Sequence, residues 1–236
     1  MKCIILAGGY GTRLAEETKI KPKPLVKIGN KPIIWHLMKI YSFYGIKNFI
    51  ICMGYKGDLL KKEVDILNRT EKWNIKYVNT GLKTMTGGRI KRIKKYLNKD
   101  DIFFCLSYGD GLSDVNIKKL IQFHKRNKKV VTLTAVKYKN PKGVLKINNN
   151  SKISAIKEKP IEYINGGFFI LSQKIFKFLK DDKTIFEKDC LPKLVKKKQL
   201  MAYKHNGFWA CMDTMREKQE LNRIWKSKQK AWKIWI

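Results

Sequence analysis

A glycine-rich loop near the N-terminus is the first stretch of this chain that could do chemistry; it reads GGYGTR over residues 8–13. Glycine lacks a Cβ and tolerates unusual dihedrals, so the backbone N–H groups of such a loop can approach an anion closely. Thr12 adds a hydroxyl donor, and Arg13 adds a planar guanidinium that matches phosphate oxygens. The loop follows a short apolar run, residues 3–7, long enough for one buried strand. A phosphate-binding loop is one interpretation, and a tight turn is the other.

Two lysines come next, in Lys21-Pro22-Lys23-Pro24. Each proline fixes its own backbone and keeps the residue before it extended, so the lysine side chains are held outwards. The glycine spacing matches neither the P-loop nor the dinucleotide-binding fingerprint. Glycines, a threonine, an arginine and two lysines gathered at one strand end nevertheless exceed what a turn requires. We interpret this stretch as a cradle for a polyphosphate.

The strings GGYGTRL and KPKPLVKIGNKPI together resemble the signature of the sugar-phosphate nucleotidylyltransferases, also called nucleotide-sugar pyrophosphorylases. The residues Glu-Glu-Thr at 16–18 stand where most members carry a proline, and this variant is similar to members that use CTP and glucose 1-phosphate. Further motifs extend the resemblance over nearly the whole chain. It implies an enzyme that depends on Mg2+ and transfers a cytidylyl group from CTP to α-D-glucose 1-phosphate. The products would be pyrophosphate and CDP-glucose, the latter for deoxysugar and cell-surface polysaccharide synthesis.

Alternatives to this activity remain open. Residue chemistry alone does not separate cytosine from uracil, so a thymidylyl- or uridylyltransferase acting on a sugar 1-phosphate is the second interpretation. A non-catalytic, nucleotide-sugar-binding regulatory protein is the third. The net charge of +33 also suggests nucleic acid, because basic surfaces attract phosphate backbones. The lysines are spread along the chain and outnumber the arginines that such surfaces concentrate, so we expect no specific nucleic-acid partner.

A second glycine pair lies in the string MTGGRIKR, residues 85–92, ahead of a predicted amphipathic helix. A helix that begins after the pair would present backbone donors to an anion or to a nucleotide edge. Alone, the pattern is typical of an ordinary helix start. The string is similar to the nucleotide-binding segment of the family, and on that basis Thr84 and Arg89 are expected to contact the nucleotide.

Two aspartates follow strands of the predicted sheet. Asp110 comes soon after the apolar run 102–107 and lies between two glycines. A carboxylate beyond the carboxyl end of a central strand faces the crevice in which open α/β sheets bind ligands, although an Asp-Gly turn has the same sequence. Asp213 resembles the second metal ligand of the family. The two aspartates are expected to hold one Mg2+, a cation that prefers carboxylate and phosphate oxygens.

The resemblance also implies a sugar site. Glu158 and Lys159 stand in a Glu-Lys-Pro motif, in which the glutamate contacts sugar hydroxyls and the lysine lies near the sugar phosphate. Asn165 and Gly166 begin the string NGGFF, which lines the sugar pocket of the family. In full, the resemblance implies catalytic roles for Arg13, Lys23 and Asp110, nucleotide binding by Leu6, Ala7, Gly8, Gly9, Gly11, Thr12, Arg13, Thr84, Arg89 and Gly109, sugar-phosphate binding by Lys23, Glu158, Lys159, Asn165 and Gly166, and metal binding by Asp110 and Asp213.

Apolar runs of strand length alternate with helical periodicity along the chain, which predicts an α/β fold. We expect a Rossmann-like, mixed but mostly parallel central sheet with helices on both faces. No linker or repeat divides the sequence, so one nucleotidyltransferase domain is expected over residues 1–236. An antiparallel hairpin, formed by 143–147 and 152–156, is expected to lie over the sugar site. Asp114 is a candidate cap for a helix over 115–127.

Other features bear on compartment and assembly. No apolar stretch is long enough to span a membrane and no signal peptide is evident, so we expect a cytoplasmic protein without a membrane partner. The five cysteines form no CxxC pair and are expected to be buried free thiols. The three histidines are expected to be structural. A C-terminal group of tryptophans, Trp225, Trp232 and Trp235, has near-helical spacing and is expected to pack against the body or a neighbouring subunit.

The expected partners follow from the same resemblance: a nucleoside triphosphate and a sugar 1-phosphate. Relatives oligomerise, so a homo-oligomer is expected. The segment between Leu67 and Trp73 is shorter than in relatives of the cytidylyltransferase type, which leaves the size of that oligomer open.

Overall fold

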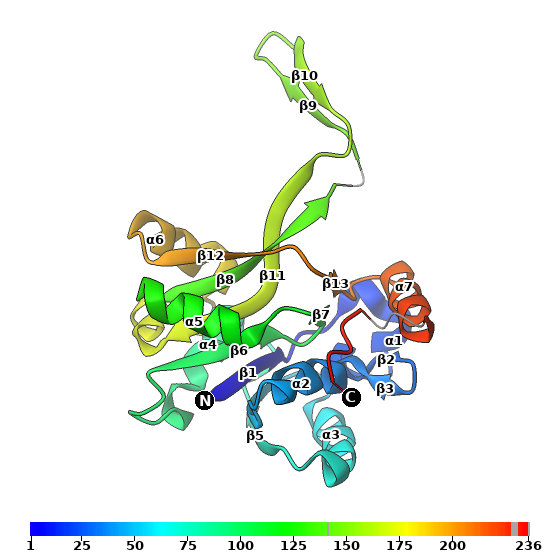
Figure 1. Cartoon of the computed structure of the whole chain (residues 1–236), viewed down its shortest axis with the longest axis vertical. Helices are drawn as coiled ribbons and strands as arrows, with labels where there is room; N and C mark the ends of the chain where they lie inside the picture. The colour runs from blue at the N-terminus through cyan, green and yellow to red at the C-terminus, as the bar shows by residue number, and fades with distance from the viewer. Residues whose placement is uncertain (141, 228–230, 236) are drawn as a thin grey trace.

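A seven-stranded sheet forms the centre of the molecule in the computed structural model, which describes residues 1–140, 142–227 and 231–235 (Figure 1). In spatial order its strands are β12 (Leu200–His205), β8 (Val131–Lys139), β11 (Ile161–Ser172), β6 (Phe103–Tyr108), β1 (Lys2–Ala7), β4 (Asn48–Met53) and β5 (Asn74–Asn79). β1 is parallel to β4 and β6, β4 to β5, and β8 to β12. Only β11 is antiparallel to its neighbours, β6 and β8, so the mixed, mostly parallel sheet is confirmed.

Helices cover both faces of the sheet, as predicted. Alternate residues of β1 point to opposite faces: Cys3 and Ile5 belong to one buried cluster and Ile4 to the other. The first cluster includes apolar side chains of α2 (Ile33–Phe43), α3 (Gly57–Glu71), α5 (Ile117–Asn127) and α7 (Met215–Lys226). The second includes side chains of α4 (Thr86–Arg92) and α6 (Leu191–Lys196). Each helix buries one apolar stripe against the sheet.

Short elements join these layers. β7 (Gly111–Ser113) follows β6 and pairs antiparallel with β13 (Trp209–Cys211), outside the main sheet. The remaining short elements are η1 (Thr12–Leu14), α1 (Ala15–Thr18), η2 (Lys23–Leu25), β2 (Lys27–Ile28), β3 (Lys31–Pro32), η3 (Lys94–Tyr96), η4 (Gln173–Phe178) and η5 (Phe186–Cys190), of which η5 is a π-helix.

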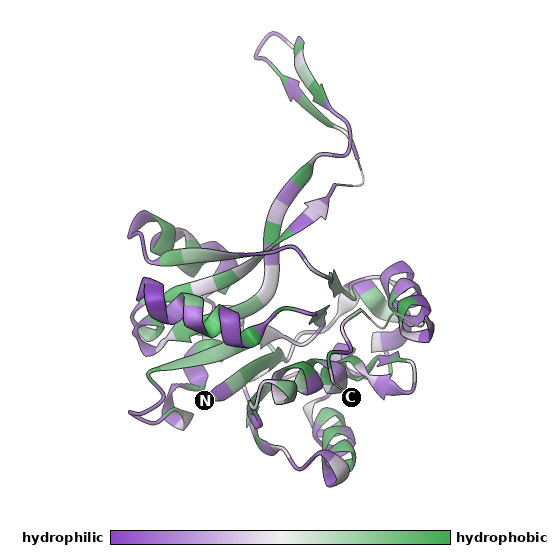
Figure 2. Ribbon diagram, viewed as in Figure 1, coloured by the Kyte–Doolittle hydropathy of each residue, from purple (hydrophilic) through white to green (hydrophobic). Residues whose placement is uncertain are grey.

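A hairpin of β9 (Val144–Ile147) and β10 (Ile153–Lys157) is antiparallel, as predicted. We call residues 144–157 the hairpin arm. β8 and β11 pair as far as Lys139 and Ile161, and their paired ends carry the arm away from the body (Figure 1). The expected position over the sugar site is therefore wrong, because the arm projects outwards and all but one of its strand residues are exposed. Figure 2 shows apolar residues on this projecting element.

Two further expectations need correction. Asp114 does not cap α5: the cap is Asn116, whose Oδ1 accepts a hydrogen bond from Lys119 N at 2.9 Å. The helix begins later than expected because Val115 is fully buried in the core and Asp114 instead pairs with His205. The tail packs against the body as predicted, since Trp232 is fully buried and stacks on Phe208.

Helical structure in this tail ends at Lys226, and residues 228–230 and 236 lie outside the described residues. In the described ranges, no helix combines the length and apolar character needed to cross a membrane.

Candidate active site

A cavity of about 740 Å³ opens at the carboxyl ends of β1 and β6. These two strands are parallel neighbours, so the loops that follow them emerge at the same edge of the sheet. The cavity is lined by these expected site residues: Leu6, Ala7, Gly8, Gly9, Gly11, Thr12, Arg13, Lys23, Thr84, Arg89, Gly109, Asp110, Asn165, Gly166 and Asp213. The structure brings all of them together, whereas Glu158 and Lys159 lie elsewhere.

The glycine-rich loop has the geometry of an anion cradle. Within the described residues, the backbone N–H groups of Gly9, Tyr10 and Gly11 donate no hydrogen bond. A Cβ added at Gly9 would meet nothing within 4 Å, so that side of the loop is open. Gly11 adopts φ +68°, a left-handed conformation that favours glycine, and its carbonyl accepts a hydrogen bond from Thr18 Oγ1 at 3.1 Å. The loop is held from one side and free to bind on the other.

Gly8 is required for a different reason, which involves Arg89. A Cβ at Gly8 would lie 1.9 Å from Arg89 Nη1. The Arg89 side chain is 5% exposed, and its guanidinium donates hydrogen bonds to Gly8 O at 3.0 Å, Met53 O at 3.2 Å and Thr80 Oγ1 at 2.5 Å. Burial lowers the pKa of Arg89. Arg89 therefore holds the loop in place through the carbonyl of Gly8. Its guanidinium is also part of the cavity wall.

The second glycine pair does not offer free donors, contrary to expectation. Gly87 and Gly88 lie inside the first turn of α4, and their N–H groups donate to Thr184 O at 2.9 and 3.3 Å. Added Cβ atoms would meet Thr184 at 2.7 Å and Asp182 at 2.6 Å. These glycines allow close packing against the segment 182–184, a contact that the sequence pattern did not reveal. Thr84, 7% exposed, does line the cavity.

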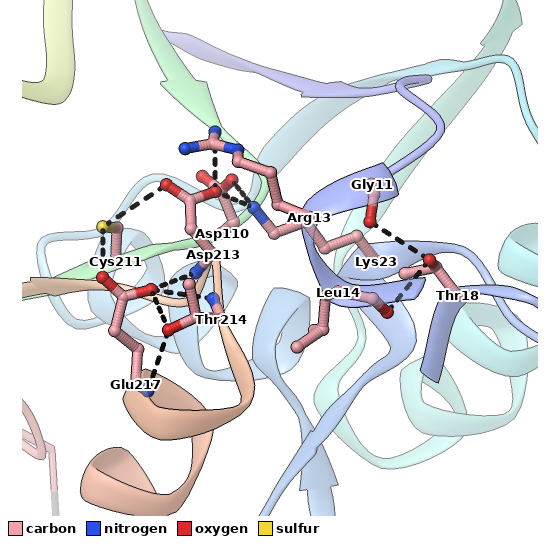
Figure 3. Close-up of polar contacts among 10 residues, drawn as sticks. All are labelled: Gly11, Arg13, Leu14, Thr18, Lys23, Asp110, Cys211, Asp213, Thr214 and Glu217. Carbon is pink, nitrogen blue, oxygen red and sulfur yellow. Dashed lines mark hydrogen bonds and ion pairs between the residues drawn. The ribbon is translucent and has the colours of Figure 1, made fainter. Parts of the chain in front are cut away.

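The Lys23 ammonium contacts both aspartates (Figure 3). Its Nζ is 2.5 Å from Asp110 Oδ2 and 2.5 Å from Asp213 Oδ1, and its side chain is 12% exposed. Burial alone would lower the pKa of Lys23, but the charges and hydrogen bonds of the two carboxylates outweigh it and raise the pKa. Arg13 Nη2 lies 2.9 Å from Asp213 on a side chain that is 72% exposed, so the guanidinium is free to turn toward a ligand.

The pairing of β7 with β13 explains how residues so distant in sequence meet. Cys211 faces Gly111 across this ladder, and Met212 N donates to Asp110 O at 3.0 Å. Asp213 follows at once and is fixed by α7, because Glu217 Oε2 accepts its N–H at 2.7 Å. The same carboxylate closes a capping box with Thr214, which Figure 3 shows below the aspartates.

Asp110 and Asp213 fit a divalent cation. Their oxygens converge on one cationic atom, Lys23 Nζ, and an all-oxygen donor set suits a hard ion. Cys211, Asp213 and Glu217 also place ligand atoms within 4.8 Å of one another. Glu217 is already used by the helix cap, so the pair Asp110 and Asp213 is the better candidate.

The part of the cavity around Asn165 and Gly166 contains residues that the sequence did not single out. Trp209 Nε1 donates to Gly166 O at 2.7 Å and lines the cavity beside it. Tyr108 also lines the cavity, and Asn165 Nδ2 donates a hydrogen bond to its hydroxyl at 3.3 Å. The position of Tyr108, directly before Gly109 and Asp110 at a strand end, was the only signal for it in the sequence.

The residues expected from the Glu-Lys-Pro motif are not in this cavity. Glu158 and Lys159 follow the hairpin arm, with side chains 72% and 52% exposed. No residue of the described part of the arm lines the cavity. The chain's own fold therefore leaves these two predicted sugar-phosphate contacts outside the site.

The histidines lie apart from the cavity lining, as expected of structural residues. Each ring contacts a different partner: His36 Nε2 lies 3.0 Å from Ile28 O, His124 Nδ1 lies 2.9 Å from Thr132 Oγ1, and His205 Nε2 lies 2.9 Å from Asp114 Oδ1.

The fold and the cavity together define a nucleotidyltransferase, and the chain belongs to this family: residues 2–226 match the family model described as Nucleotidyl transferase. The chain is 44% identical to glucose-1-phosphate cytidylyltransferase from Salmonella typhimurium over 258 aligned residues, covering 100% of both chains. It is 31% identical to mannose-1-phosphate guanyltransferase from Yarrowia lipolytica, covering 89% of this chain and 60% of that protein. The crystal structure of HddC from Yersinia pseudotuberculosis complexed with GMP-PN matches with a TM-score of 0.75 and 27% identity, over 95% of this chain and 99% of that one.

Proposed function

We propose that this protein transfers a cytidylyl group from CTP to α-D-glucose 1-phosphate, giving CDP-glucose and pyrophosphate. The observation that carries the reaction class is the cavity, in which unbonded loop amides, Arg13 and Lys23 meet two converging carboxylates. The choice of CTP and glucose 1-phosphate rests on the 44% identity to the Salmonella typhimurium enzyme over its full length. The product fits a role in deoxysugar and cell-surface polysaccharide synthesis.

In the proposed reaction this chain's residues align two anions and balance their charge. The amides of residues 9–11 and Arg13 hold the triphosphate, and Lys23 contacts its phosphates. Asn165 and Gly166 present polar groups to the sugar. A phosphate oxygen of the sugar 1-phosphate attacks the α-phosphorus in line, and pyrophosphate leaves. The attacking oxygen is already ionised, so the rate enhancement comes from alignment and electrostatic stabilisation without a general base.

Mg2+ is the proposed cofactor, held by Asp110 and Asp213. When bound, the ion offsets negative charge that develops on phosphate oxygens. Support comes from the convergence of two carboxylate oxygens on one cationic atom, each at 2.5 Å. Loss of activity on chelation, with recovery on adding Mg2+, tests this assignment.

The base and sugar are tested by supplying glucose 1-phosphate and Mg2+ with CTP, UTP, ATP, GTP or dTTP in turn. We expect pyrophosphate release to be fastest with CTP and the mass of CDP-glucose in the product. Faster release with UTP or dTTP would replace the cytidylyl assignment with a uridylyl- or thymidylyltransferase. Tight nucleotide-sugar binding without release from any triphosphate would support a regulatory binding protein instead.

Two subsidiary proposals concern location and charge. We propose a cytoplasmic enzyme, supported by five free cysteines, of which four are buried. We also propose that the net charge of +33 serves no specific nucleic-acid partner. The second proposal is tested by measuring the affinity for several nucleic-acid sequences at increasing salt concentration. Non-specific binding should weaken steeply with salt and to the same extent for every sequence.

We further propose that the protein self-associates through the hairpin arm. Leu145 pairs with Ile156 and Ile147 with Ile153, which places the four side chains on one face. They are 50%, 67%, 60% and 55% exposed, respectively. A two-stranded hairpin is only marginally stable alone, and a contiguous exposed apolar face marks an interaction site. A second copy of the chain is the proposed partner.

This assembly would also account for Glu158 and Lys159. Both follow the arm and lie outside the cavity of their own chain. An arm that packs on a neighbouring copy would carry the two side chains toward that copy's sugar side. We propose that their contacts with the sugar phosphate are made between copies.

A further inference from the structure

A carboxylate behind the cavity, that of Glu187, links the nucleotide side of the site to the sugar side. Glu187 lies in η5, a single turn of π-helix, a geometry that recurs at functional sites. Its Oε1 accepts a hydrogen bond from the Tyr108 hydroxyl, and its Oε2 accepts one from Thr86 Oγ1 at 2.7 Å. Thr86 Oγ1 in turn accepts Phe186 N at 2.9 Å. Both oxygens of a half-buried anion are thus used by two residues that line the cavity.

Tyr108 connects Glu187 to the part of the cavity that is proposed to bind the sugar. It is the last residue of β6, and its ring lies directly against Gly167, where an added Cβ would be 2.8 Å from Cδ2. Close packing against Gly167 therefore holds the Tyr108 ring in place. Phe169 packs edge-on against the same ring, with 5.5 Å between the two ring centroids. The phenol donates its one hydrogen to Glu187 Oε1, which leaves the phenol oxygen to accept a second bond.

Asn165 is the donor of that second bond. Its Nδ2 donates to the Tyr108 hydroxyl at 3.3 Å, and its Oδ1 accepts Gly167 N at 2.9 Å. These two hydrogen bonds fix the orientation of the Asn165 amide, with Nδ2 toward Tyr108 and Oδ1 toward Gly167. One N–H and one lone pair of the amide remain for a ligand in the cavity. Free rotation of the phenol hydrogen would remove one of the two contacts that set this orientation.

We propose that Glu187 is a positioning residue for the sugar 1-phosphate: it fixes the Tyr108 hydroxyl, which fixes the Asn165 amide that faces the sugar. This inference rests on the proposed function. Thr86 anchors the carboxylate from the other side and holds η5 against α4. Glu187 touches no reacting atom in this scheme, so its loss weakens sugar binding more than it slows the chemical step.

The test compares Tyr108→Phe, Glu187→Ala and the double variant. Tyr77→Phe is the matched control, because the Tyr77 hydroxyl donates to Asp65 Oδ1 at 2.6 Å outside the cavity. We expect each single variant to raise the KM for glucose 1-phosphate about tenfold, the range for losing a hydrogen bond to a charged group. The KM for CTP and kcat should change less than about threefold, and the double variant should be no worse than Glu187→Ala alone. Tyr77→Phe should match the wild type.

Additive losses in the double variant, or equal effects on both substrates, would overturn the positioning role. Tyr108→Phe removes one oxygen, so it keeps the test valid if Glu187→Ala does not fold. A parallel double-mutant cycle on thermal unfolding measures the Tyr108–Glu187 coupling without substrate. Coupling in unfolding with no pyrophosphate release by the wild type would sink the proposed function and leave the Tyr108–Glu187 contact established. Release by the wild type with no coupling between the two residues would sink this inference alone.

Discussion

The cavity and the segment that follows the hairpin arm carry residues expected in the same site, but the fold positions them very differently. The glycine-rich loop and Asp110 follow β1 and β6, neighbouring strands at the centre of the sheet. Glu158 and Lys159 follow an arm whose strands contact each other and are exposed to solvent. A residue at the end of a buried strand inherits its position from the core. A residue on an unsupported hairpin needs a partner surface to acquire one.

The largest effect is expected in the cavity. Lys23→Met should reduce turnover by about 100- to 1,000-fold, because it removes the preorganised cation that the proposed reaction uses to contact the phosphates. Circular dichroism should show an unchanged fold. Lys27→Met, an exposed lysine four residues further along, is the control and should keep full activity. Turnover near the wild-type value in Lys23→Met would remove this lysine from the mechanism and weaken the contrast with the arm.

The second prediction asks whether the arm acts on its own chain or on a neighbour. Glu158→Ala/Lys159→Ala and Lys23→Met should each be nearly inactive as pure preparations. Co-assembled mixtures should regain a measurable share of wild-type pyrophosphate release. In a mixed oligomer, a cavity with an intact Lys23 can be completed by the intact Glu158 and Lys159 of the other variant. Mixed oligomers that stay inactive would place Glu158 and Lys159 at their own chain's cavity.

The third prediction concerns assembly. Ile147→Asp/Ile156→Asp places two charges on the apolar face of the arm and should shift the protein to a smaller species in analytical ultracentrifugation. Lys146→Asp alters a strand neighbour that points to the opposite face, and it should leave the sedimentation profile unchanged. An unchanged profile in the double aspartate variant would exclude the arm as the contact between copies.

The smallest expected effect is a dependence of the free energy of unfolding on pH. Burial lowers the pKa of His36 and of His124 to about 4, below the ordinary value near 6.5. The unfolded chain therefore binds more protons than the folded chain between these values, and stability is lost as pH falls through this window. Each histidine should contribute about 2 kcal/mol to the loss between pH 7 and pH 5. Chemical denaturation of the wild type and of His124→Gln at both pH values measures this loss of stability. If the variant loses as much stability as the wild type between pH 7 and pH 5, the contribution assigned to His124 is contradicted.

Local sequence was sufficient for much of the fold and for the part of the site that follows β1 and β6. The loop at residues 8–13 and the turn at Asp110 each follow a strand directly, so short-range spacing placed them at the sheet edge. The continuous apolar run of β1 is buried on both faces of the sheet, with Cys3 and Ile5 in one cluster and Ile4 in the other, which agrees with the predicted helices on both faces. Gly87 and Gly88 were misread because a glycine needed for packing against a distant segment looks the same in sequence as one that frees a donor.

What the sequence determined by itself is the strand-and-glycine pattern, the type of each reacting group, and the family. Only the tertiary structure decided which groups share a cavity. Lys23 and Asp213 are 190 residues apart, and Tyr108 and Glu187 are 79 apart. Such pairs leave no spacing signal, because their meeting depends on how β7 pairs with β13 and how η5 packs on α4. The arm shows a second limit of prediction from sequence. Its strands were predictable from alternation, but its direction was set by how far β8 and β11 extend beyond the core.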